Sequence, residues 1–291
     1  MVTAYKKKTV FITGSSSGIG LATAKYFQEK GWNVAATMRN PADQPELARL
    51  PNVITPALDV TDKASINNAL QATLDQFGKI DVLLNNAGYA LMGAFETQNE
   101  EQIRRQFDTN VFGLMEVCRA VLPHFRQRRT GLVINVASMV GRVPLPLYSV
   151  YNASKHAVEG FTEGLVYELE PFGVRVKIIE PGAVNTNFFG RSSDRANATG
   201  ESTYADYSRE QLGVMDDIGP GGSRPIDAAK VIWQAANDDS RRLRYSVGID
   251  ARALLAARRL LPETLFRDMI KLSLSRPSYQ ALGQYIYRPK A

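Results

Sequence analysis

Residues 8–20, KTVFITGSSSGIG, decide the fold. An apolar run that stops abruptly at glycine predicts a buried strand over residues 8–13. The pattern that follows predicts a helix over residues 18–30, closed by Gly31 as a C-terminal cap. A glycine-rich turn between a strand and a helix lets backbone N–H groups and the helix N-terminus meet phosphate oxygens. The segment therefore predicts a dinucleotide-binding loop, with a purely structural turn as the alternative.

The rest of the chain continues this alternation of strands and helices. Further strands are predicted over residues 32–37, 53–58, 80–84, 132–137, 174–179 and 244–247. Helices are predicted over residues 63–77, 99–127, 149–170 and 226–236. Alternation of this kind implies a parallel sheet. We therefore expect an α/β protein with a single-domain Rossmann fold, a doubly wound parallel sheet with helices on both faces.

Two segments depart from this rhythm. Residues 183–224 are rich in Ser, Asn, Gly and Asp and show no sustained period, which predicts an irregular substrate lid. Residues 250–291 form a C-terminal extension with helical patterning that breaks at Pro262 and Pro277. Because no internal repeat or linker divides the chain, residues 1–291 are expected to form one domain.

The formal charge of +6 is unevenly distributed. Residues 241–291 hold 11 Lys/Arg and 3 Asp/Glu, a net of +8, which leaves −2 for the remainder (24 against 26). This tail lacks the basic and aromatic interleaving of a nucleic-acid surface, so no nucleic-acid partner is expected. Its leucines, Leu254, Leu260 and Leu261, could complete the pocket, form subunit contacts or touch an anionic membrane. Packing on the body is favoured over membrane contact, and both a homo-dimer and a homo-tetramer stay open.

Cysteine and histidine are scarce. The one cysteine, Cys118, lies in an apolar helical run and cannot form an internal disulfide. With only two histidines, His124 and His156, the chain offers almost nothing for a metal site, and none is predicted. The sequence shows no apolar stretch of signal-peptide length near its start and no run long enough to span a bilayer. We therefore expect a soluble, cytoplasmic protein.

A candidate catalytic group consists of Ser138, Tyr151 and Lys155. Ser138 follows a predicted strand, at the carboxyl edge where sheets of this kind bind ligands. Positions i and i+4 share a helix face, so the Lys155 ammonium can lie near the Tyr151 phenol and lower its pKa from about 10 towards working pH. Tyr26 and Lys30 match the same spacing without a polar partner upstream, which shows that the spacing alone is weak. The alternative is a surface tyrosine and lysine on a helix.

Taken together, these motifs resemble the classical short-chain dehydrogenases/reductases over residues 8–186. The resemblance rests on TGSSSGIG (13–20), Asp59-Val60, NNAG (85–88), Asn110, Ser138, Tyr151 with Lys155, Pro181-Gly182 and Thr186. It implies that Tyr151 is the general acid/base and that Ser138 binds the substrate oxygen. It also implies that Lys155 lowers the pKa of the tyrosine and holds the nicotinamide ribose. Asn110 would position a water that relays protons to Lys155.

The loop and the resemblance together indicate the coenzyme site. In the resemblance Asp59 and Val60 contact the adenine, and Thr186 contacts the carboxamide. The full set of expected coenzyme residues is Gly14, Ser16, Ser17, Gly18, Ile19, Gly20, Arg39, Asp59, Val60, Asn86, Ala87, Gly88, Tyr151, Lys155, Pro181, Gly182, Val184 and Thr186.

The end of the second predicted strand bears on the choice of coenzyme. Folds that prefer NAD place an acid there to bind the ribose 2′-hydroxyl. Here the segment reads Ala-Thr-Met-Arg, ending at Arg39, and the first carboxylate is Asp43. Arg39 could pair with a 2′-phosphate, which favours NADP(H) over NAD(H). A solvated arginine is the alternative.

The expected substrate pocket is mostly apolar. The expected lining residues are Ser138, Tyr148, Tyr151, Tyr89, Met92, Val140, Phe188 and Phe189, with Leu91, Val143 and Leu145 nearby. Such a lining predicts a small apolar carbonyl or alcohol as substrate. The strand-end sequence and the long segment after Thr186 resemble the hydroxysteroid and retinol dehydrogenase branch of the family.

Three functions fit the sequence to different degrees. The leading hypothesis is an NADP(H)-dependent oxidoreductase that interconverts a secondary alcohol and a ketone on a steroid-, retinoid- or aryl-ketone-like substrate, with an NAD(H)-dependent enzyme as its variant. A non-catalytic dinucleotide-sensing regulator typically lacks the tyrosine or the lysine, and both are present here. An isomerase or dehydratase of the extended group would have a differently spaced glycine loop and a longer chain.

Overall fold

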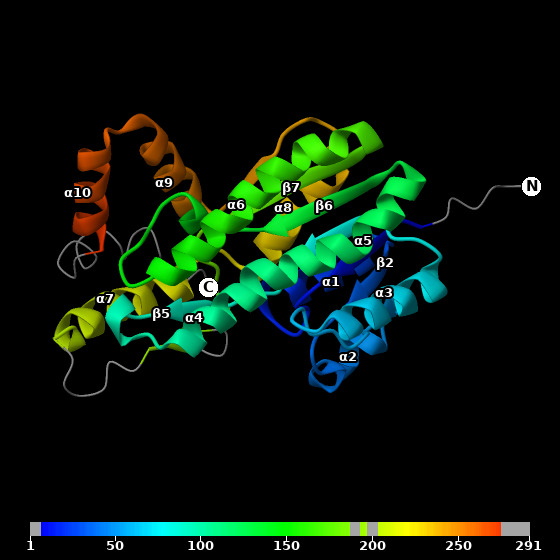
Figure 1. Ribbon diagram of the computed structural model, residues 1–291, viewed down its shortest axis with the longest axis horizontal. Coiled ribbons are helices and arrows are strands. Elements are labelled where there is room, and N and C mark those ends of the chain that lie inside the picture. The colour runs from blue at the N-terminus through cyan, green and yellow to red at the C-terminus, as the bar shows by residue number, and fades with distance from the viewer. Residues whose placement is uncertain (1–6, 187–192, 197–202, 275–291) are drawn as a thin grey trace, which may run out of the picture.

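A seven-stranded parallel sheet forms the centre of the computed structural model, which describes residues 7–186, 193–196 and 203–274 (Figure 1). The strand order is β3-β2-β1-β4-β6-β7-β9. The strands are β1 (Thr9–Ile12), β2 (Asn33–Ala36), β3 (Val53–Ile54), β4 (Val82–Asn85), β6 (Gly131–Val136), β7 (Val174–Pro181) and β9 (Arg244–Val247). The order reverses between β1 and β4, and open sheets bind ligands in the crevice at such a switch point.

Helices cover both faces of this sheet. The main ones are α1 (Gly18–Glu29), α3 (Lys63–Phe77), α5 (Leu114–Arg128), α6 (Ser149–Leu169) and α8 (Pro225–Asn237). Alternate residues of the buried strands point to opposite sides: Val10 and Ile12 pack with α1 and α8, whereas Phe11 packs with α3, α5 and α6. The predicted doubly wound Rossmann fold is confirmed.

The C-terminal helices lie beyond one end of the sheet. α9 (Ile249–Leu260) and α10 (Glu263–Ser273) are grouped there with α7 (Ala205–Ile218), away from the N-terminal end of the chain (Figure 1). Together they enclose a third apolar cluster that includes Met215, Leu255 and Phe266. The predicted helix break at Pro262 is confirmed, and Pro277 lies outside the described residues.

The predicted lid over residues 183–224 is not irregular throughout. Its described part contains the 14-residue helix α7 and a short strand, β8 (Ser193–Arg195), which pairs with β5 (Ala90–Met92). Helix α7 was not predicted because its buried apolar residues, Val214, Met215 and Ile218, are confined to its last turns. Strand β5 was not predicted because three residues are too few to show the alternation of a strand.

Other elements also differ from the sequence predictions. The strand expected over residues 53–58 ends at Ile54, because Pro56 has no N–H to donate, and only an isolated bridge between Met38 and Ala57 continues the pairing. A short helix, α2 (Pro45–Ala48), was missed. The helix expected over residues 99–127 is divided into α4 (Glu100–Phe107), a π-turn (Asp108–Gly113) and α5.

Candidate active site

The glycine loop joins β1 to α1 as a half-buried backbone cradle. Gly14 and Gly18 have φ of +71° and +55°, which L side chains rarely adopt. A Cβ on Gly20 would collide with the Gly14 carbonyl oxygen and would lie 2.6 Å from Asn86 Nδ2. Asn86 in turn donates to the carbonyl oxygens of Thr13 (3.0 Å) and Gly14 (2.9 Å). The loop is thus held with its amides at a helix N-terminus, an arrangement that fits a pyrophosphate.

A cavity of about 1530 Å³ runs along the carboxyl edge of the sheet from this loop. It brings together nearly all the residues predicted for the coenzyme. These are Gly14, Ser16, Ser17, Gly18, Ile19, Arg39, Asp59, Val60, Asn86, Ala87, Gly88, Tyr151, Lys155, Pro181, Gly182, Val184 and Thr186. Gly20 is buried behind the loop, where it allows the close contact with Asn86.

Ser138, Tyr151 and Lys155 line the same cavity. Ser138 caps the 3-10 turn η4 (Met139–Gly141), with its hydroxyl accepting from the Val140 N–H at 3.3 Å, and it is hydrogen-bonded to Tyr151. Tyr151 and Lys155 share one face of α6, and the Lys155 Nζ lies 5.8 Å from the centroid of the Tyr151 ring. The Lys155 Nζ also donates to the Val136 carbonyl oxygen at 2.9 Å. The structure therefore brings the three predicted catalytic residues together.

Asn110 lies behind this group in the π-turn, a kind of irregularity that occurs frequently at functional sites. It is buried, and its side-chain amide donates to the Tyr89 carbonyl oxygen (2.9 Å) and to Ser154 Oγ (3.3 Å). A Cβ on Gly88 would lie 3.0 Å from Asn110 Oδ1 and 3.7 Å from Lys155 Nζ. Gly88 thus keeps open the space between the amide and the ammonium. A water relay through Asn110 stays a prediction.

Burial has opposite effects on the two titratable groups of the site. It raises the pKa of the Tyr151 phenol well above its usual range, against the lowering effect of the hydrogen bond with Ser138. It lowers the pKa of Lys155 to about 8, against the opposing charge of Glu159. The net shift of the Tyr151 pKa in this structure is upward rather than towards working pH, because the desolvation of the phenol dominates, and a lowering contribution from Lys155 stays a prediction. At neutral pH Tyr151 carries its proton and can donate it.

Any reaction that this site catalyses by proton donation from Tyr151 should slow as the pH rises through about 8. The lowered pKa means that the Lys155 ammonium is present below about pH 8 and is lost above it, whereas Tyr151 stays protonated over that range. The measurement is the turnover number for reduction from about pH 6 to about pH 10. A rate that stays constant over this range would contradict the account.

The substrate end of the cavity is largely apolar. Of the predicted substrate residues, Tyr89, Val140 and Tyr148 line it along with Ser138 and Tyr151. Met92 is instead fully buried and packs in the third apolar cluster, outside the set of lining residues. Phe188 and Phe189 lie outside the described residues. Several lining residues on α7, α9 and α10 or directly after α10 were not predicted: Met215, Ile218, Ile249, Ala253, Ile270 and Leu274.

The basic extension therefore contributes directly to the site. Leu254, one of the three leucines singled out in the tail, lines the cavity, whereas Leu260 and Leu261 are exposed.

Within the described residues no group of three His, Cys, Asp or Glu side chains could hold a metal ion. Over the same residues, none of the helices is both long and apolar enough to cross a membrane.

A doubly wound sheet whose switch point holds a phosphate cradle beside a Ser-Tyr-Lys group defines a nicotinamide-dinucleotide oxidoreductase. Residues 8–197 match the family described as short chain dehydrogenase, and the chain belongs to this family. An uncharacterized oxidoreductase of Schizosaccharomyces pombe is 41% identical over 72% of this chain and 88% of its own length. The 3-ketodihydrosphingosine reductase of Bacteroides thetaiotaomicron is 33% identical over 90% of this chain and 96% of its own.

Solved structures support the same assignment. A short-chain dehydrogenase from Streptomyces avermitilis has a TM-score of 0.78 and 32% identity, over 97% of this chain and 98% of that one. ElxO, with NADP bound, has a TM-score of 0.70 and 25% identity, over 85% and 99% of the two chains. A Burkholderia phymatum enzyme in complex with NAD has a TM-score of 0.78 and 26% identity, over 91% and 96%. Relatives thus bind NADP or NAD.

Proposed function

We propose that the protein is an NADP(H)-dependent oxidoreductase that interconverts a secondary alcohol and a ketone on an apolar substrate. The observation that carries the proposal is the position of the hydrogen-bonded Ser138–Tyr151 pair. It lies in one continuous cavity between the glycine loop and the apolar walls contributed by α7, α9 and α10. A carbonyl held there would meet a proton donor beside apolar walls.

The residues of the chain divide the chemistry between them. A nicotinamide dinucleotide supplies or accepts the hydride when it is bound. Tyr151 donates its phenolic proton to the carbonyl oxygen in reduction and accepts it back in oxidation. The Ser138 hydroxyl, fixed by the Val140 N–H, orients the same oxygen. The Lys155 ammonium lies on the cavity wall beside Tyr151 and places positive charge next to the proton donor.

Arg39 supports NADP(H) as the coenzyme. It lines the cavity at the end of β2 with Ser16 and Ser17, and it forms no ion pair or hydrogen bond with the residues that the structure describes. The nearest acid along the chain, Asp43, accepts a hydrogen bond from Asn40 Nδ2 at 2.9 Å. A guanidinium at this position can pair with a 2′-phosphate, which NADP has and NAD lacks.

We expect NADPH to bind more tightly than NADH, and Arg39→Ala to narrow the difference. A hydrogen bond to a charged group contributes about 1.5–3 kcal/mol, or roughly one to two orders of magnitude in affinity. Dissociation constants of both coenzymes, measured for both proteins, provide the test. Equal affinities of the unaltered protein for NADPH and NADH would indicate that Arg39 is a solvated surface residue and would favour the NAD(H)-dependent alternative.

The substrate class is tested by a panel of ketones. Steroid, retinoid and aryl ketones represent the hydroxysteroid and retinol dehydrogenase branch. Long-chain aliphatic ketones represent the substrate named for the Bacteroides relative. NADPH oxidation is followed with each ketone, and Tyr151→Phe serves as the control for background oxidation. Turnover of apolar ketones with little turnover of charged ones is expected. Turnover confined to charged carbonyl compounds would reject the proposal.

A further inference from the structure

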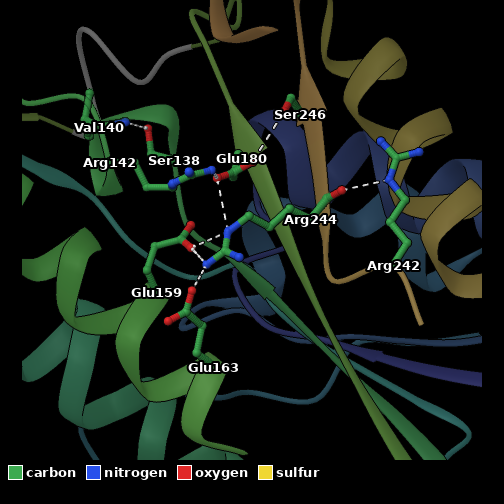
Figure 2. Close-up of polar contacts among 9 residues, drawn as sticks. All are labelled: Ser138, Val140, Arg142, Glu159, Glu163, Glu180, Arg242, Arg244 and Ser246. Atoms are coloured by element: carbon green, nitrogen blue, oxygen red, sulfur yellow. Dashed lines mark hydrogen bonds and ion pairs between the residues drawn. The ribbon is translucent and has the colours of Figure 1, made fainter. Parts of the chain in front are cut away.

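A cluster of five charged residues lies beside the cavity residues Ser138 and Lys155 without lining the cavity itself: Arg142, Glu159, Glu163, Glu180 and Arg244. Arg244 at the start of β9 is its centre (Figure 2). Its guanidinium donates to Glu159 Oε2 from Nε (3.1 Å) and Nη2 (2.9 Å), and it is also paired with Glu163. Its Nε lies 3.6 Å from Glu180 Oε1. One side chain thus joins β9, α6 and β7.

The cluster reaches the catalytic serine through Arg142. The Arg142 Nη1 lies 3.3 Å from Glu180 Oε1, and Arg142 ends the 3-10 turn η4 that Ser138 begins (Figure 2). Gly141, in the same turn, packs directly on α6. A Cβ there would lie 2.9 Å from the Lys155 carbonyl oxygen and 3.0 Å from Glu159 Cγ. The turn that presents Ser138 is therefore both tethered by charge and pressed against the helix that carries Tyr151.

The cluster also reaches the catalytic lysine. Glu159 is one helical turn after Lys155, and its charge raises the pKa of the lysine against the effect of burial. Glu159 is 5% exposed and Glu180 is 1% exposed, so their charges are only weakly screened. Burial and the neighbouring Glu180 raise the pKa of Glu159 itself to about 7, against the opposing charges of Arg244 and Arg142. Its second oxygen, Oε1, has no hydrogen-bond partner among the described residues.

We propose that Glu159, held by Arg244, is a positioning residue for the reaction, acting on Ser138 through the turn at residues 139–142 and on Lys155 through its charge. Glu159 does not touch the cavity, so it acts only through these residues. The expected effect on turnover rests on the proposed ketone–alcohol reaction. The expected effect on the order of the turn at residues 139–142 rests on the geometry alone.

The test compares Glu159→Gln with Glu163→Gln. Both variants remove a carboxylate paired with Arg244, but the Glu163 side chain is 52% exposed and lies one turn further from Lys155. Glu159→Gln keeps the size of the side chain, and Arg244 stays beside Glu163 and Glu180, so folding should survive. Thermal melting checks this directly.

Two readouts are measured on the same proteins. The first is hydrogen–deuterium exchange of residues 138–143, which reports the order of the turn without any substrate. The second is the turnover number as a function of pH. For Glu159→Gln we expect about 10-fold faster exchange, about 10-fold lower turnover and a shift of the limb near pH 8 to lower pH. For Glu163→Gln we expect changes within about two-fold.

Each outcome decides the proposal. Equal behaviour of the two variants in exchange overturns it even if no substrate is turned over. Faster exchange in Glu159→Gln without a change in turnover or in the pH limb also overturns it, since the cluster would then only stabilise the fold. If Glu159→Gln does not fold, Arg142→Gln replaces it, and unchanged exchange in that variant overturns the proposal. A lack of turnover in the unaltered protein would count against the proposed function instead.

Discussion

Tyr151→Phe should reduce turnover by at least about 10²- to 10⁴-fold while leaving coenzyme affinity within about two-fold of the unaltered protein. The substitution removes the proton donor, whose pKa is raised by burial, and keeps the ring that is packed against Tyr148 at a centroid distance of 6.0 Å. Because packing is preserved, a loss of activity would report on the chemistry. Turnover and coenzyme binding are measured on one preparation.

Tyr26→Phe is the matched control. Tyr26 and Lys30 have the same i, i+4 spacing, and the Lys30 Nζ lies 5.3 Å from the ring centroid, close to the 5.8 Å of the catalytic pair. Tyr26 is packed against Trp233 of α8, however, and is not part of the cavity lining. We expect the activity of the Tyr26→Phe variant to equal that of the unaltered protein. Retention of most activity in Tyr151→Phe would reject the assignment of the general acid.

Gly20→Ala should weaken coenzyme binding by roughly 5- to 150-fold, the equivalent of the 1–3 kcal/mol typical of overpacking. The added methyl group would meet the Gly14 carbonyl oxygen and the Asn86 amide, the two groups that hold the loop in shape. The loop must therefore move, and its amides lose their alignment toward the phosphates. Titration with NADPH measures the effect.

Gly160→Ala provides the control for adding a methyl group. Gly160 lies within α6 and is exposed, and a Cβ there would meet nothing within 4 Å. Alanine within a helix is favoured over glycine by about 0.5–1 kcal/mol, so this variant should be slightly more stable and bind coenzyme normally. Normal binding by Gly20→Ala would show that the loop tolerates the methyl group and is not the phosphate cradle.

Local patterns in the sequence predicted most of the fold. The apolar run before Gly14 and the helical period after Gly18 mark β1 and α1, and the 3.6-residue period over residues 63–77 matches the bounds of α3. The order of motifs along the chain also separated Tyr151 from Tyr26, which spacing alone could not do. These features depend on neighbours within one or two turns, which a sequence displays directly.

Features made by distant contacts were missed. β5 exists because it pairs with β8, about 100 residues later, and neither strand is long enough to show a period. The apolar residues of α9 and α10 line the cavity only after these helices have folded against the edge of the sheet. Glu159 and Arg244 are 85 positions apart, and an isolated charge in a sequence indicates a solvated surface until the partner is known. The burial that raises the pKa of Tyr151 is likewise a property of the assembled site.

Hydride transfer is tested most directly by following deuterium from the reactive position of the nicotinamide ring of labelled NADPH into an apolar ketone. If Tyr151 is the proton donor for hydride transfer, one deuterium should appear on the carbinol carbon for each coenzyme oxidised, and Tyr151→Phe should suppress the transfer while still binding the coenzyme. Tight coenzyme binding with no deuterium in any product of the ketone panel would contradict the account and indicate a protein that binds the dinucleotide without turning it over.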